Sequence, residues 1–225
     1  MRAAVISLLT VLALSLPQLG LAQDPQPMEQ PTLKAGDRWV YSWNDSRNRK
    51  GRSTWTVARI ADFDGAPAYY IERTSEWTTA QGEKRTGKDT QIRDMQLNVL
   101  ARLDDRGRVT SKRKLQFFRW PLAVGAQWES DGTFEFLDRG TWVQRRAKLF
   151  VQVKAAEEIA VPQGQAVAFR IYSIFRRFSA DGNTALGHSE EEHWLSPAVR
   201  FFAKGWYKEG TYRSEYALVE FQLTP

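Results

Sequence analysis

Alternation of side chains with a period of two is the feature that most constrains the fold of this chain. Aromatic side chains occupy every second position between residues 38 and 44, namely Trp39, Tyr41 and Trp43. Phe169 and Ile171 share one side of a similar run over 167–175, and a third run covers 212–223. Because successive side chains of a β-strand point to opposite faces, this period predicts strands with one apolar face.

Short segments containing Asp or Gly separate the alternating runs: 62–65, 104–107, 131–132, 138–140 and 180–183. Both residue types tolerate the positive φ of hairpin turns, and strands joined by short turns pair antiparallel. Spacing typical of βαβ units is absent, and residues 154–159 give the one weak indication of a helix. We therefore predict an all-β fold of about nine to twelve strands, arranged as a single strongly curved antiparallel sheet or an open (half) β-barrel with little helix.

The chain has 225 residues and contains no cysteine, which excludes disulfides, thiolate metal sites and thiol nucleophiles. Its stability must therefore come from apolar burial, and a chain of this size can bury about 70% of the surface that its unfolded form exposes. We expect one β domain over residues 33–225.

The first residues have the pattern of a cleaved secretory signal peptide. Arg2 precedes an apolar stretch over 5–16, and small residues before Gln23 indicate cleavage after Ala22. The alternative, a membrane anchor, is disfavoured because the apolar stretch is short, and no transmembrane segment is expected in the mature chain. We predict a signal peptide over 1–22, a flexible segment over 23–32 and a periplasmic or secreted protein.

Two sets of spaced identities suggest an internal repeat. The residues Leu33, Gly36 and Trp39 recur 89 positions later as Leu122, Gly125 and Trp128. Seven further identities occur at an offset of 100 between 65–101 and 165–201. We interpret these matches as a duplication of 33–119 and 122–225; the alternative is a coincidence of small residues at similar turns.

Three segments carry a resemblance to a known group of proteins. They are PLAVGAQW at 121–128, VPQG at 161–164 leading into AFRI at 168–171, and WLSPAV at 194–199. In this order they resemble a broad group of uncharacterised bacterial periplasmic and envelope proteins. The resemblance implies a curved antiparallel β-sheet and an envelope location, and it implies no activity. This chain departs from the group after Pro197, where Ala198 replaces the glycine that is common there.

The two histidines, His188 and His193, flank an acidic run and are the one cluster that could hold a divalent metal. Residues five apart face opposite sides of a strand, so we expect no metal site there. We interpret the cluster as a solvated acidic turn before a strand that begins near Trp194. We expect no cofactor, and Ser-His-Asp hydrolysis could arise only through one of these histidines.

Acid–base catalysis would need other groups. The adjacent acid pairs at 104–105 and 157–158 could serve a hydrolase, although adjacent acids are more often surface charge. We therefore expect a protein that is not an enzyme and has no catalytic residues, with a carboxylate-dependent hydrolase as an alternative.

The chain has a formal charge of +6, and its basic residues form three clusters. They are Arg47, Arg49, Lys50 and Arg52; then Arg106, Arg108, Lys112, Arg113 and Lys114; and finally Arg145, Arg146 and Lys148. An anionic envelope surface is a candidate partner, and nucleic acid is not, since no recognition motif for it is present. The alternative is that these residues keep exposed strand edges soluble.

Nine Trp, seven Tyr and twelve Phe give the chain a large aromatic content. These side chains could form only the core of the sheet. Alternatively, a concave apolar face could bind a hydrophobic ligand such as a lipid chain, with Trp39, Tyr41, Trp43, Phe169 and Ile171 as the ligand-binding residues. We favour this non-catalytic binding function; a structural partner of cell-envelope machinery is the other candidate.

Overall fold

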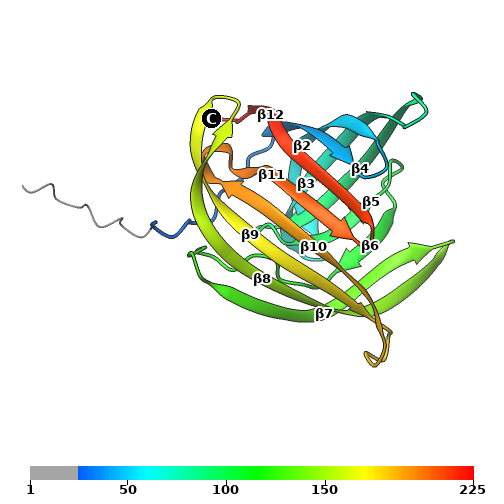
Figure 1. Cartoon of the computed structure of the whole chain (residues 1–225). Helices are drawn as coiled ribbons and strands as arrows, with labels where there is room; N and C mark the ends of the chain where they lie inside the picture. The colour runs from blue at the N-terminus through cyan, green and yellow to red at the C-terminus, as the bar shows by residue number, and fades with distance from the viewer. Residues whose placement is uncertain (1–24) are drawn as a thin grey trace, which may run out of the picture.

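The computed structural model describes residues 25–225. Within this range the chain forms twelve β-strands and one 3-10 turn (Figure 1). The strands are β1 (Arg38–Asp45), β2 (Lys50–Phe63), β3 (Ala66–Thr78), β4 (Lys84–Asp94), β5 (Val99–Leu103), β6 (Val109–Arg113), β7 (Gln127–Asp138), β8 (Thr141–Val161), β9 (Gly164–Phe178), β10 (Ala185–Ser196), β11 (Phe201–Glu209) and β12 (Tyr212–Gln222), with the 3-10 turn η1 (Pro197–Val199) before β11.

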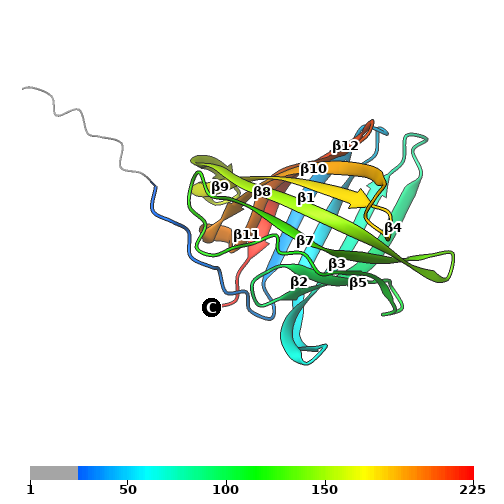
Figure 2. The same ribbon diagram turned by 90° about the horizontal axis from the view of Figure 1, so that it is seen from below.

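The twelve strands form a closed antiparallel barrel (Figures 1 and 2). Each strand pairs with its neighbours in sequence, and β1 also pairs with β12, where Trp39 lies opposite Phe221 and Trp43 lies opposite Tyr216. The predicted all-β antiparallel fold with little helix is confirmed. The open or half barrel is corrected to a closed one, because pairing between β1 and β12 removes both edges that an open sheet would expose.

Two local predictions were wrong. Residues 131–132 do not form a turn but lie inside β7, where a Cβ at Gly132 would come within 1.9 Å of the Lys114 carbonyl oxygen. The glycine is therefore needed for close backbone approach rather than for a turn. Residues 154–159 belong to the 21-residue strand β8 and not to a helix. Pairing with β9 along its length overrides the weak helical preference of this segment.

The alternating connections give the barrel two different ends. Several connecting segments meet at one end, which we call the closed end. They lie before β1, between β4 and β5, between β6 and β7, and around η1. Its core contains Leu33, Trp39, Leu97, Phe118 and Phe201, all at most 1% exposed. The hairpins at the other end, such as 45–50 and 78–84, surround what we call the open end.

The same backbone turn precedes the first strand of each half of the barrel. Gly36 has a φ of 95° and donates its N–H to the Val57 carbonyl at 2.8 Å, while Gly125 has a φ of 85° and donates to Val153 at 2.9 Å. A β-bulge follows each of these two valines. The residues that suggest a repeat in the sequence therefore build equivalent local structures before β1–β6 and before β7–β12.

The N-terminal segment is attached to the barrel at Met28 and at Gln30, whose side-chain amide donates to the Met95 carbonyl. Met28 is 4% exposed and exchanges two backbone hydrogen bonds with Leu122. The flexible segment over 23–32 stays a prediction, and its residues 23 and 24 lie outside the described residues. The predicted signal peptide over 1–22 lies outside the described residues. In the part of the chain that is described, no helix has the length and apolar character needed to cross a membrane.

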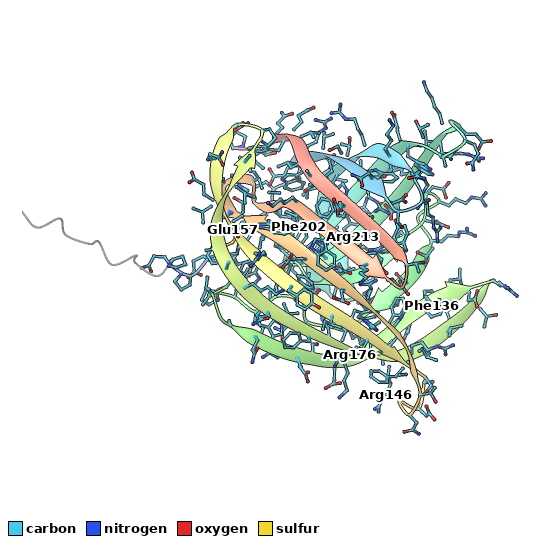
Figure 3. The ribbon with its side chains drawn as sticks, viewed as in Figure 1. Phe136, Arg146, Glu157, Arg176, Phe202 and Arg213 are labelled. Carbon is cyan, nitrogen blue, oxygen red and sulfur yellow. The ribbon has the colours of Figure 1, made fainter. Side chains whose placement is uncertain are left out.

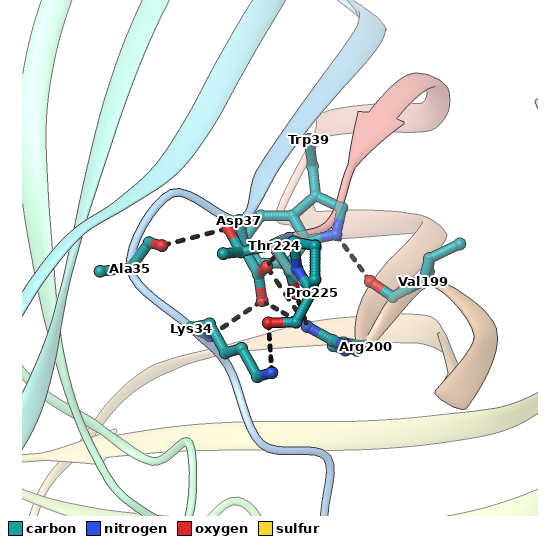
Figure 4. Close-up of polar contacts among 8 residues, drawn as sticks. All are labelled: Lys34, Ala35, Asp37, Trp39, Val199, Arg200, Thr224 and Pro225. Carbon is teal, nitrogen blue, oxygen red and sulfur yellow. Dashed lines mark hydrogen bonds and ion pairs between the residues drawn. The ribbon is translucent and has the colours of Figure 1, made fainter.

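At the closed end, a buried carboxylate joins the chain segments that precede the first strand and follow the last strand (Figure 4). Asp37, which is fully buried, accepts hydrogen bonds from the backbone N–H of Thr224 at 2.7 Å and of Lys34 at 2.9 Å. The Arg200 guanidinium lies 3.4 Å from the same carboxylate and donates to the Thr224 carbonyl at 3.0 Å. Asp37 therefore connects the segment before β1, the turn after η1 and the segment after β12.

Asp37→Ala should lower the free energy of unfolding by about 2–4 kcal/mol, because it leaves buried N–H groups and the Arg200 charge without their acceptor. Urea unfolding followed by tryptophan fluorescence measures this change. Asp181→Ala is the matched control, since Asp181 also accepts a backbone N–H bond but is exposed, and it should cost less than about 1 kcal/mol. Equal losses in the two variants would contradict the assigned role.

Candidate functional site

A cavity of about 710 Å³ lies inside the barrel. Its wall is rich in aromatic side chains: Tyr41, Trp43, Trp55, Trp77, Phe117, Phe175, Phe202 and Tyr216. The cavity reaches the surface near Gly87 and Lys88, which are exposed. Pockets for small organic ligands are typically about 300–1,000 Å³ and mostly apolar. In size and lining, the cavity matches a ligand site.

Small side chains on several strands leave this space open. Ser53, Ser75, Ser173 and Ser214 contribute to the wall from β2, β3, β9 and β12. An eight-stranded barrel is just wide enough for its own side chains to fill, so a barrel of twelve strands has more interior than its core can occupy. The core cluster fills the closed end, and the serines keep the middle of the barrel free.

The five residues predicted to bind a ligand divide into two groups. Tyr41 and Trp43 line the cavity. Trp39, Phe169 and Ile171 are buried in the core cluster and do not line it. For example, the Trp39 ring centroid lies 4.9 Å from that of Phe201, and its indole N–H donates to the Val199 carbonyl at 2.7 Å. The ligand-binding role of all five stays a prediction.

Three arginines from adjacent strands point into the cavity. Arg93 on β4, Arg102 on β5 and Arg113 on β6 contribute to its wall. Burial, together with the charge of Arg102, lowers the pKa of Arg93 to about 10. Burial, followed by the charge of Arg113, lowers the pKa of Arg102 to about 10 as well. All three guanidinium groups therefore remain charged at neutral pH, in surroundings that disfavour charge.

Aromatic rings and one ion pair surround these arginines. The Arg113 guanidinium lies 5.2 Å from the Phe134 ring centroid and 5.3 Å from that of Phe175, in the range of cation–π contacts. Another wall residue, Arg73, forms a bidentate pair with Asp89, with both N–O distances at 2.7 Å. The Arg73 charge is therefore neutralised within the wall, in contrast to that of Arg113.

A chain of hydrogen bonds crosses the wall from β10 to β12. Glu191 lies 2.9 Å from Nε2 of His193, and Nδ1 of His193 lies 2.7 Å from the Tyr216 hydroxyl. Burial opposes ionisation of Glu191, but the hydrogen bond from His193 and the charges of Arg113 and Arg102 lower its pKa overall. Burial, followed by the Glu191 charge, raises the pKa of Tyr216 well above its usual value. Tyr216 therefore stays protonated.

This chain of hydrogen bonds occupies both ring nitrogens of His193. A Ser-His-Asp triad needs one nitrogen free to accept a proton from serine, so the arrangement does not provide the triad through His193. His188 lies on the opposite face of β10, with its side chain 61% exposed, and its nearest carboxylate is that of Glu190 at 3.8 Å. Among the described residues, no group of three metal-ligating side chains comes together.

The charged wall residues were missed in the sequence. The acidic run, predicted to be a solvated turn before Trp194, belongs instead to β10, which begins at Ala185. Arg113 belongs to one of the three basic clusters of the sequence, and its side chain lines the cavity. Arg146 of another cluster lies outside on β8 (Figure 3). The alternation of Glu191, His193 and Leu195 on one face of a strand was the signal that could have located this wall.

The comparisons with known proteins give similarity only to solved structures, since no family model and no curated protein matches the chain. A chain from Parabacteroides distasonis, provisionally described as a lipoprotein, is 11% identical with a TM-score of 0.48, over 88% of this chain and 100% of its own. A protein from Bacteroides fragilis, provisionally described as exported and with a YmcC-like fold, is 10% identical with a TM-score of 0.45, over 88% and 100%. The hypothetical lipoprotein YmcC from Escherichia coli is 6% identical with a TM-score of 0.40, over 86% and 89%.

Glu191→Gln should lower the free energy of unfolding at pH 7 by about 1–3 kcal/mol, because it removes a charged acceptor from His193 and a negative charge from Arg102 and Arg113. The folded-state pKa of Glu191 lies below its unfolded value of about 4.3, so its stabilisation is complete above that pH and is lost as the pH falls through the folded pKa. Urea unfolding of both proteins at pH 7 and at pH 3 measures the difference, which should shrink at the lower pH.

Glu158→Gln is the control for this experiment, because Glu158 is exposed on β8 and should change stability by less than about 0.5 kcal/mol. A difference between wild type and Glu191→Gln that stays constant or grows toward pH 3 would show that Glu191 is not held ionised by its neighbours.

Proposed function

We propose that this protein is an exported envelope protein that binds a hydrophobic ligand, such as a lipid chain, inside its barrel without transforming it. The observation that carries the proposal is the cavity of about 710 Å³, which has an aromatic wall and an opening to solvent. Burial of apolar surface is favourable by about 25 cal/mol per Å². Binding of an apolar chain enclosed by these rings therefore becomes more favourable as the chain becomes longer.

The aromatic residues near the open end support this proposal. Trp43 and Trp77, whose ring centroids are 6.4 Å apart, lie on β1 and β3 close to the hairpins of that end. Both are cavity residues and both remain partly exposed. Partly exposed rings at the entrance of a cavity offer an apolar surface to an entering ligand.

Export rests on the sequence. Arg2, the apolar stretch over 5–16 and the small residues up to Ala22 have the order of a signal peptide. A periplasmic or secreted location would place the cavity where lipids of the envelope are available. Three alternatives stay predictions: a structural role in cell-envelope machinery, binding to an anionic envelope surface, and a carboxylate-dependent hydrolase. The cavity favours the ligand-binding function over them.

The neutral fluorescent probe N-phenyl-1-naphthylamine should bind the wild-type protein with one site, and its fluorescence should rise on binding. Ser75→Trp should weaken this binding at least tenfold, because the new ring fills the cavity. Thr74→Trp is the matched control, since Thr74 is exposed and does not line the cavity, and it should bind the probe as the wild type does.

Titration of the probe measures both affinities, and circular dichroism checks that each variant is folded. Ser214→Trp on β12 fills the cavity from another side and gives an independent test if Ser75→Trp does not fold. Absence of probe binding to the wild type, or equal binding to the inner and outer variants, would overturn the proposed site.

A further inference from the structure

We propose that the cavity selects amphiphiles that carry one anionic head group, a carboxylate or a phosphate, and that Arg102 and Arg113 hold this head group. The inference rests on the proposed function, because it assigns a ligand class to the same cavity. It goes further in giving the ligand a charge, an orientation and two recognition residues.

The register of the strands brings these arginines together. Arg102 on β5 pairs with Ser111 on β6, so Arg113 lies two residues along the same inner face. On the other side of β5, Arg102 pairs with Gln91 on β4, and Arg93 lies two residues further along that strand. Arg93 and Arg113 therefore flank Arg102 on the wall, on the side toward the closed end.

Arg102 and Arg113 lack the partners that buried arginines normally have. Neither forms an ion pair within the described range of the chain, and the buried Nε–H of each finds no acceptor there. Buried polar groups in proteins are almost always hydrogen-bonded, and the guanidinium fork suits the bidentate geometry of carboxylate and phosphate. Both arginines line the cavity without an ion pair, so their guanidinium groups could pair with an anion that enters it.

The neighbouring charges do not compensate these two arginines fully. Asp89 is paired with Arg73. Arg93 donates to two neutral acceptors, the Leu97 carbonyl and the Gln91 side chain. Glu191, the carboxylate that faces both Arg102 and Arg113, is hydrogen-bonded to His193. The wall therefore carries more positive than negative charge, and an anionic ligand would reduce the cost of burying it.

The aromatic residues fix the orientation of such a ligand. Phe134 and Phe175 pack edge to face against each other and both lie within cation–π distance of Arg113, so apolar surface begins directly beside the charged groups. Trp43 and Trp77 lie further toward the open end. An amphiphile with its head group at Arg102 and Arg113 would therefore direct its chain past these tryptophans toward the entrance.

Displacement of N-phenyl-1-naphthylamine by four competitors tests this inference. Dodecanoate and dodecyl phosphate, each below its critical micelle concentration at pH 7, should displace the probe from the wild type at concentrations at least tenfold lower than dodecan-1-ol. Inorganic phosphate alone should not displace it. The ratio between dodecanoate and dodecyl phosphate identifies which of the two head groups is preferred.

The double variant Arg102→Gln/Arg113→Gln should lose the preference for the two anions while keeping its affinity for the probe and for dodecan-1-ol. The matched control is Arg106→Gln/Arg108→Gln, which removes two exposed arginines from the hairpin between β5 and β6 and should keep the preference. If the inner double variant does not fold, the two single variants should each reduce the preference.

The outcomes separate this inference from the proposed function. Anions that bind no more tightly than dodecan-1-ol would overturn the assigned head group and leave hydrophobic binding intact. A preference that persists in the inner variants would overturn the role of Arg102 and Arg113, and displacement by inorganic phosphate alone would show that no amphiphile is required. If neither the probe nor the alcohol binds the wild type, the proposed function fails.

Discussion

Pairing between β1 and β12 is the interaction on which the rest of the structure depends. These strands are the first and last of the sheet, and their backbone hydrogen bonds convert a meander into a barrel. Without this pairing, both strands would be edges, and their inward residues, such as Tyr41 and Tyr216, would face solvent. Asp37 reinforces the seam from the closed end, because its carboxylate holds the segments before β1 and after β12.

Closure produces an interior with two distinct parts. At the closed end, side chains such as Trp39 and Phe201 pack as an apolar core. Beyond them the wall carries arginines, Glu191 and His193 beside aromatic rings. Buried charged groups cost free energy unless they are paired. A barrel interior that served only as a packed core would therefore be lined by apolar side chains instead. This combination of rings and incompletely compensated arginines is the basis of our proposal that the ligand has both apolar and anionic parts.

The sequence predicted the local structure well because strand periodicity and turn residues act over short distances. The aromatic alternation at Trp39, Tyr41 and Trp43 identified an inner face correctly, whereas closure was not predicted, since pairing between residues about 180 positions apart leaves no local signal. The charged wall was missed for a similar reason. A basic run such as Lys112, Arg113 and Lys114 is normally surface charge, and only the register of β5 and β6 shows that its middle residue faces inward.

Cysteine cross-linking across the β1–β12 seam tests the central claim, closure of the barrel, most directly. Ser42 and Ala217 are paired and exposed on the outer face, and the chain has no cysteine of its own to compete. Cα atoms of paired antiparallel residues are about 4.5–5.5 Å apart, within the range that a disulfide spans. In the Ser42→Cys/Ala217→Cys variant, mild oxidation should join the two thiols within one chain, which mass spectrometry of a tryptic digest would detect. Free thiols or only intermolecular links would show that the sheet is open.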